Sequence, residues 1–120
     1  MSVFIERPTV IKPVGDKSKI IEEFIGVVNT NTFEVSIAKM TSHSGWEEPA
    51  QKPEFNEYTL VIKGELKVKT EDGEFTVKAG QAFIAQKGEK VQYSTPGAEG
   101  AEYIAVCLPA FTPETAHREV

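Results

Sequence analysis

Histidine and cysteine, the side chains that most often hold transition metals or run redox chemistry, are almost missing from this sequence. Its 120 residues include two histidines and a single cysteine, Cys107. One cysteine forms no internal disulfide, which suits a reducing compartment, so we expect a cytoplasmic protein. Because Cys107 stands between Val106 and Leu108, we expect a small buried apolar residue rather than a reactive thiol.

Long apolar runs and clusters of basic residues are also missing. No stretch approaches the roughly 18 consecutive apolar residues of a membrane-spanning helix, and the N-terminus lacks the pattern of a signal peptide. Thirteen lysines and arginines stand against eighteen acidic residues, which gives a net charge of -5. Because phosphates and anionic lipids attract basic surfaces, we expect neither nucleic acid nor a membrane as a partner.

What the sequence does contain is an alternation of apolar and polar residues, interrupted by glycine turns. Leu66 and Val68 share one face of a predicted strand, and Lys67 lies on the other face. The Glu-Asp-Gly-Glu segment at 71–74 predicts a hairpin turn, because glycine adopts the positive φ that such turns need. The same alternation predicts further strands at 33–38, 75–78, 81–85, 91–94 and 103–108.

A helix is expected at one place only. Residues 16–24 put three apolar side chains on one helical face with Asp16 as the N-cap, and a strand or an irregular segment is the alternative. Many short strands with hardly any helix predict an all-β sandwich or barrel, and the length predicts a single domain over residues 1–120. The tail at 109–120 is expected to pack along the outside of the barrel or against a partner subunit.

Two spaced motifs make the chain similar to a known family. Their glycine and glutamate positions are occupied by Gly45, Glu57 and Gly64 in residues 45–64 and by Gly80 and Gly88 in residues 80–95. In this spacing the chain resembles the cupin superfamily. The first cupin motif is a glycine, two histidines, a glutamate and a second glycine, and the second motif ends in a third histidine. The resemblance implies a cupin-type jelly-roll β-barrel with little helix.

The metal-ligand positions of that family are substituted here. The resemblance implies a metal held by three imidazoles and a carboxylate, of which only the carboxylate, Glu57, is present. Gln51, Pro53 and Val91 stand at the histidine positions, and an amide oxygen is a weak neutral ligand. We therefore expect no cofactor, with a divalent metal as the disfavoured alternative. Its oxygen ligands would be Gln51, Glu57 and Glu54.

The lumen of the barrel is expected to hold a small molecule instead. By alternation Thr59 shares the face of Glu57. The predicted ligand-binding residues are Met40, Trp46, Gln51, Glu57, Thr59, Tyr93 and Tyr103. Burial should raise the pKa of Glu57, which suits a catalytic acid or base with Tyr93 as its partner. The alternatives are a filled core around a hydrogen-bonded Glu57, and Trp46 packed outside the sheet.

Several functions remain open for such a barrel. One is a metal-independent acid–base enzyme that acts on a small carboxylate or a sugar-like substrate. Others are a non-catalytic binding or sensing module, a structural oligomeric barrel, and an atypical metal cupin with oxygen ligands. The resemblance also implies a homodimer, and the apolar segments 3–5 and 9–11 are suited to pairing between subunits.

Overall fold

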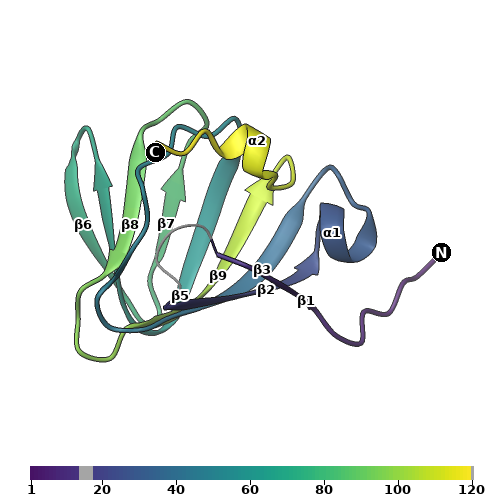
Figure 1. Ribbon diagram of the computed structural model, residues 1–120, viewed down its shortest axis with the longest axis horizontal. Helices are drawn as coiled ribbons and strands as arrows, with labels where there is room; N and C mark the ends of the chain where they lie inside the picture. Colours follow the sequence, from purple (N-terminus) through teal and green to yellow (C-terminus); the bar gives the residue numbers. More distant parts are fainter. Residues whose placement is uncertain (14–17, 120) are drawn as a thin grey trace.

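The computed structural model describes residues 1–13 and 18–119, and β-strands form most of it (Figure 1). The elements in chain order are β1 (Thr9–Ile11), β2 (Lys19–Ile25), α1 (Val27–Thr30), β3 (Ser36–Ser42), β4 (Trp46–Glu47), β5 (Asn56–Thr70), β6 (Gly73–Lys78), β7 (Ala82–Ala85), β8 (Val91–Thr95), β9 (Ala101–Leu108) and α2 (Pro113–Ala116). Neither helix in the described part of the chain is long and apolar enough to cross a membrane.

All strand pairs are antiparallel, and the sheet curls so that two layers face each other. The strand order is β1-β2-β3-β9-β5-β8-β4, with β6 and β7 also paired to β5. The first part of β5 pairs with β9 and β7, and its last part pairs with β6 and β8. One long strand therefore belongs to both layers, as expected for a jelly-roll barrel.

The bend in β5 falls at the second glycine of the first motif. Gly64 has a φ of 75°, a backbone conformation that side chains disfavour. A Cβ added to Gly64 would lie 2.0 Å from the carbonyl oxygen of Gly100. The two backbones thus approach too closely for any side chain, which is a physical reason for glycine at this position.

The core lies between the two layers and follows the predicted alternation. Leu66 and Val68 are fully buried, together with Trp46 and Val61. A second cluster, formed by Phe55, Cys107 and Ala116 with Phe111 against it, fills one end of the barrel. The predicted hairpin is present, since Thr70 pairs with Gly73 at the start of the β5–β6 ladder.

The helix expected at 16–24 is wrong over its described part. Lys19–Ile25 forms β2, whereas Asp16 lies outside the described residues. β2 pairs with β1 on one side and with β3 on the other, so its backbone groups form hydrogen bonds to both neighbours. This outweighs the low stability of a short isolated helix. The buried side chains Lys19 and Glu23 are charged. The sequence of this strand therefore lacks the alternation of apolar and polar residues by which strands are predicted.

Two other expectations need correction. The strand predicted at 33–38 is Ser36–Ser42, and its buried side carries the small residues Ser36 and Ala38. The C-terminal tail crosses one end of the barrel instead of following its outside (Figure 1). Backbone hydrogen bonds hold it there, from the N–H of Glu54 to Thr115 O and from the N–H of Glu119 to Ala50 O.

Replacing Gly64 with alanine should therefore destabilise the barrel strongly. We expect a loss of about 3 kcal/mol in the free energy of unfolding, from the positive φ and the contact with Gly100 together. Gly80→Ala is the matched control, since Gly80 has a φ of 85° with nothing near the added Cβ, and it should cost about 1 kcal/mol. Urea unfolding measures both, and equal losses would contradict the steric explanation.

Candidate functional site

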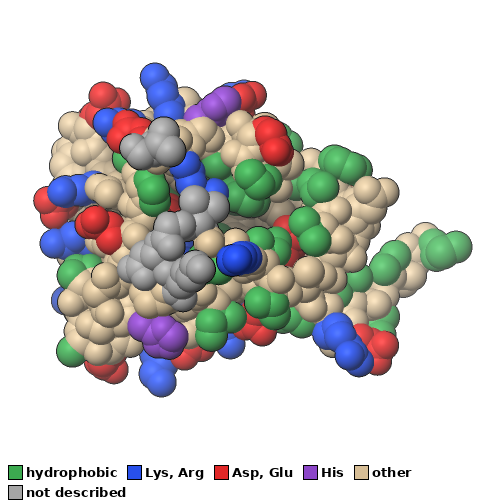
Figure 2. Space-filling view, in the orientation of Figure 1, with side chains coloured by type: hydrophobic (Ala, Val, Ile, Leu, Met, Phe, Trp, Pro, Cys, Tyr) green, Lys and Arg blue, Asp and Glu red, His purple; other side chains and the backbone are tan. Residues whose placement is uncertain are grey.

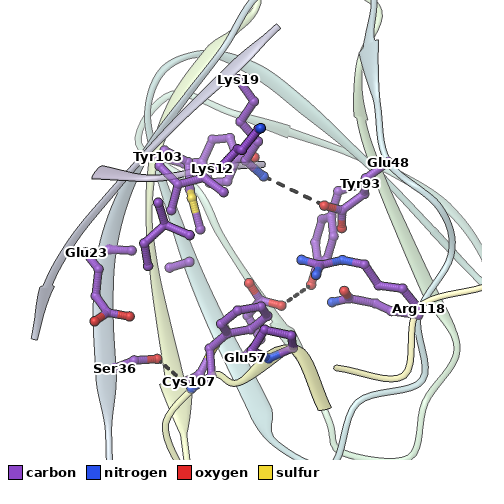
Figure 3. A pocket seen from close by; sticks show the side chains of 18 residues that line it. Lys12, Lys19, Glu23, Ser36, Glu48, Glu57, Tyr93, Tyr103, Cys107 and Arg118 are labelled. Carbon is purple, nitrogen blue, oxygen red and sulfur yellow. Dashed lines mark hydrogen bonds and ion pairs between the residues drawn. The ribbon is translucent and has the colours of Figure 1, made fainter. Parts of the chain in front are cut away.

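A cavity of about 90 Å³ lies inside the barrel. Its walls come from β1, β2, β3, β5, β8 and β9, from the segment between β4 and β5, and from the C-terminal tail (Figure 3). Small and apolar side chains such as Ala38 and Ala105 form part of the wall. Three cationic and three acidic side chains also line it: Lys12, Lys19, Arg118, Glu23, Glu48 and Glu57.

Glu57 and Tyr93 meet across the cavity from two different strands. Glu57 belongs to the part of β5 that pairs with β9 and β7, and Tyr93 is on β8. The Tyr93 hydroxyl donates to Glu57 Oε1 at 3.2 Å (Figure 3). The structure thus joins the two residues predicted as the catalytic pair.

Burial controls the protonation of this pair. It raises the pKa of the Glu57 carboxyl to about 7, with repulsion from Glu48 acting in the same direction. Attraction to Lys19, the hydrogen bond from Tyr93 and the charge of Arg118 oppose the shift. Burial also raises the pKa of Tyr93 well above its ordinary value, so Tyr93 stays a neutral donor. At neutral pH, Glu57 is therefore the member of the pair that exchanges protons.

Lys19 places a buried positive charge in the same cavity. Its Nζ lies 4.0 Å from the centroid of the Trp46 ring and 3.8 Å from Glu48 Oε1. Burial lowers the pKa of Lys19, but attraction by Tyr103, Glu48 and Glu57 outweighs this and leaves the pKa above its ordinary value. Lys19 is therefore an ammonium cation, held by a carboxylate and two aromatic rings.

Gln51 contributes a polar atom that the protein itself does not satisfy. The backbone of Gln51 exchanges two hydrogen bonds with Val91, each 2.9 Å long, which fixes the residue at the cavity wall. Its side-chain Oε1 is buried and has no hydrogen-bond partner in the described part of the chain. A buried acceptor without a donor costs about 1–3 kcal/mol. A ligand with a hydroxyl or N–H group would remove that cost.

Glu23 is buried at the opposite wall, but its carboxylate is already engaged. Its Oε2 accepts from the backbone N–H groups of Val28 at 3.0 Å and Asn29 at 2.9 Å. These bonds attach the turn of α1 to β2. Glu23 therefore stabilises the fold, and Glu57 is the carboxyl with fewer internal bonds.

The other predicted site residues divide into two groups. Met40 and Tyr103 line the cavity together with Gln51, Glu57 and Tyr93. Thr59 and Trp46 are buried in the core and do not form part of the cavity wall. Trp46 is linked to the cavity only through the lining residue Lys19, whose ammonium group lies over the Trp46 ring.

The substituted motif does not fit a transition-metal centre. Of the positions that carry ligands in the family, Pro53 and Val91 have no donor atom. Glu54, named above as a possible oxygen ligand, is exposed and contacts His117 outside the cavity, away from Gln51 and Glu57. The described residues contain no group of three or more histidine, cysteine, aspartate or glutamate side chains able to hold a metal ion. We therefore derive no step through a metal.

Five of the six charged cavity residues were not predicted from the sequence: Lys12, Lys19, Glu23, Glu48 and Arg118. Lys19 lies in the segment expected to be helical, and Glu48 directly follows another glutamate, Glu47, although its own side chain is buried. Arg118 reaches the cavity only because the tail folds back and bridges Gln51. Glu48 stands two residues after Trp46, and this spacing could have predicted that both side chains face inward. No local pattern predicts the position of Arg118.

The curled antiparallel sheet with a cavity between its layers defines a jelly-roll barrel. Residues 38–107 match the Cupin domain family, and this match spans more than half of the chain. The chain belongs to the cupin family.

One curated protein is similar to this chain in sequence, and several solved structures share its fold. The chain is 42% identical over 104 residues to a Myxococcus xanthus (strain DK1622) protein named Endoribonuclease YbeY, covering 87% of this chain and 35% of that one. This chain therefore spans about a third of that protein's length. A Bacillus subtilis oxalate decarboxylase variant has a TM-score of 0.76 at 17% identity, covering 95% of this chain and 31% of that chain. An RmlC-like cupin from Shewanella frigidimarina NCIMB 400 has a TM-score of 0.71 at 18% identity, covering 90% and 89%.

The pKa of Glu57 predicts how stability changes with pH. Between its ordinary pKa of 4.5 and about 7, the folded chain keeps a proton that the unfolded chain has lost. Stability should therefore fall by about 3 kcal/mol as pH rises through this window and level off above it. Glu57→Gln should remove this part of the pH dependence, whereas the exposed Glu65→Gln should retain it. Urea unfolding at several pH values measures the effect, and parallel curves for wild type and Glu57→Gln would contradict it.

Proposed function

We propose that the barrel binds a small polar molecule in its lumen and that Glu57 exchanges a proton with that molecule. The observation that carries the proposal is a carboxyl group with a pKa of about 7 on the wall of a cavity. A group whose pKa is near the working pH serves equally well as an acid and as a base. The substrate class is a small carboxylate or a sugar-like compound, and the reaction is metal-independent.

Each polar neighbour has a distinct part in this proposal. Tyr93 donates to one oxygen of Glu57, which orients the carboxyl and leaves its other oxygen for the ligand. The Lys19 ammonium, buried at the same cavity, favours negative charge that develops on a bound molecule. The unsatisfied Gln51 Oε1 accepts a hydrogen bond from the ligand and so fixes its orientation. The ribonuclease name belongs to a relative of which this chain matches only 35%, so we base the reaction on the cavity alone.

A non-catalytic binding or sensing module is the second candidate, and one observation favours it. Acid–base turnover often needs two groups that titrate near neutral pH. Burial raises the pKa values of Tyr93, Tyr103 and Cys107, so these three stay protonated at neutral pH and cannot serve as a second base. A binding module needs only the cavity and its orienting polar atoms.

Proton exchange in deuterated water separates the two candidates. We expect wild type to exchange C–H protons for deuterium in a panel of three- and four-carbon oxo and hydroxy compounds, both neutral and acidic, followed by proton NMR. Glu57→Gln should slow this exchange by at least about 100-fold, because it removes the proton acceptor without changing the shape. Tyr93→Phe should slow the exchange less and raise the pH at which the rate is half-maximal, because the hydrogen bond from Tyr93 lowers the pKa of Glu57.

The folded state of each variant is checked by its melting temperature. Binding of a panel compound by wild type, seen as a raised melting temperature without exchange, would assign the chain to the binding class. If no compound of the panel binds and none undergoes exchange, both candidates are contradicted and a structural barrel is left.

We also propose that a second copy of the chain is the partner, within a reducing, cytoplasmic setting that suits the single buried Cys107. The N-terminal arm, residues 1–8, projects away from the barrel (Figures 1 and 2). Val3 and Phe4 on this arm are 77% and 86% exposed. The arm continues into β1, whose outer edge has no strand beside it in the described part of the chain. Pairing between two copies would cover both features.

Removal of residues 1–8 should therefore shift the protein toward a monomer. The double change Val3→Ser and Phe4→Ser should act in the same direction, because it removes the apolar contact and keeps the backbone. Val28→Ser is the control, since Val28 is also exposed but lies on α1. Sedimentation velocity over a range of concentrations measures the state. A wild type that is monomeric at about 100 μM, well above ordinary working concentrations, would refute the dimer.

A further inference from the structure

Arg118 is a cavity cation with no ion pair among the described residues. Its guanidinium group lies 5.2 Å from the ring centroid of Phe111. The backbone bridge to Gln51 fixes the position of Arg118 at the wall. Figure 3 shows its side chain on the side of Tyr93 and Glu48, directed into the cavity. A planar guanidinium group with five N–H donors matches a carboxylate in geometry.

The charges around the cavity favour a ligand with one negative charge. Lys19 is compensated by Glu48, and the carboxylate of Glu23 is held by two backbone N–H groups. Glu57 is neutral whenever it carries its proton. The charges that remain are those of Arg118 and of Lys12, which is exposed at the rim. An anion would complement them, whereas an ammonium group on the ligand would be repelled.

Gln51 adds a second requirement. Its buried Oε1 is an acceptor, so it cannot bind a carboxylate and needs a donor from the ligand. The cationic surroundings disfavour a protonated amine in that role. A hydroxyl group satisfies the acceptor at no cost in charge.

The size of the cavity restricts the rest of the molecule. Its volume of about 90 Å³ is several times what one water needs and well below the roughly 300 Å³ at which drug-sized pockets begin. On that scale the ligand has on the order of ten or fewer non-hydrogen atoms. Ala38, Met40 and Ala105 offer an apolar surface to a short carbon chain. Nucleotides and nucleotide sugars are too large.

We propose that the ligand is a short hydroxycarboxylate whose carboxylate pairs with Arg118 and whose hydroxyl group donates to Gln51 Oε1. This inference rests on the proposed function of the cavity and names the class of its ligand. With the two ends held, the central carbon atoms lie against Glu57. Arg118 is then the residue that selects acids over neutral polyols, and Gln51 selects hydroxy acids over simple acids.

Three probes of similar size separate these roles: glycerate, glycerol and propionate. Glycerol lacks the carboxylate, and propionate lacks the hydroxyl groups. Isothermal titration calorimetry with the full chain should show that wild type binds glycerate at least about 10-fold more tightly than either of the others, as a charge-assisted hydrogen bond predicts. The rise in melting temperature with each probe gives an independent ranking of the three affinities.

Variants assign the preference to the two residues. Arg118→Gln should weaken glycerate binding by about 10- to 100-fold and leave glycerol unchanged, while Arg118→Lys should give an intermediate loss because it keeps the charge without the planar fork. Gln51→Met should weaken glycerate and leave propionate unchanged. Lys39→Gln is the control, since Lys39 pairs with Glu102 on the outside of the sheet.

The outcomes distinguish this inference from the proposed function. Equal binding of glycerate and glycerol by wild type, or no loss in Arg118→Gln, would overturn the hydroxycarboxylate. The proposed function would still stand if a neutral compound underwent exchange that depends on Glu57. Selective glycerate binding that Glu57→Gln leaves unaltered, with no exchange, would support the ligand class and contradict the acid–base role. No binding of glycerate at about 10 mM would overturn the inference, because that limit is weaker than any useful affinity.

Discussion

The close approach of two backbones, at Gly64 and Gly100, is the constraint on which the rest of the barrel depends. It lets β5 bend and serve both layers of the sheet. The first part of β5 then carries Glu57 beside β9, while the last part pairs Val68 with Tyr93 on β8. Glu57 and Tyr93 thus belong to opposite layers that face each other across the lumen. The hydrogen bond between Tyr93 and Glu57 is therefore a consequence of the bend, and the cavity exists because the two layers are joined by one strand.

Burial of charge, rather than coordination, sets the electrostatics of this lumen. The histidine positions of the family hold Gln51, Pro53 and Val91, a set whose only donor is a neutral amide oxygen. Charged side chains have entered from other elements, and most of them are compensated inside the protein, Lys19 by Glu48 and Glu23 by backbone N–H groups. Such compensation is needed because an isolated buried charge costs several kcal/mol. The charge of Glu57 is compensated only in part, and its pKa is raised as a result.

Sequence patterns predicted the parts of this structure that depend on local geometry. The glycines at the turns and the alternation of Leu66 and Val68 sufficed for the barrel, and the spacing of the motif located Gln51 and Glu57. Lys19 was missed because an inward-facing charge breaks the alternation that marks a strand. Arg118 was missed for a different reason, since its contact with Gln51 joins segments that are distant in sequence. Long-range contacts of this kind leave no periodic signal in the residues around them.

The contribution of the tail has a consequence for how the cavity works. Phe111, Pro113 and Arg118 line it, and they belong to a segment that backbone hydrogen bonds to residues 50–54 and the packing of Ala116 against Phe55 hold in place. Any ligand that pairs with Arg118 adds its binding free energy to that attachment, and a detached tail would lower the affinity by the same amount. Docking of the tail and occupation of the lumen are therefore one linked equilibrium. In the proposed ligand complex, the charge that selects the ligand would come from Arg118 on this tail rather than from a residue of the family's metal-ligand positions.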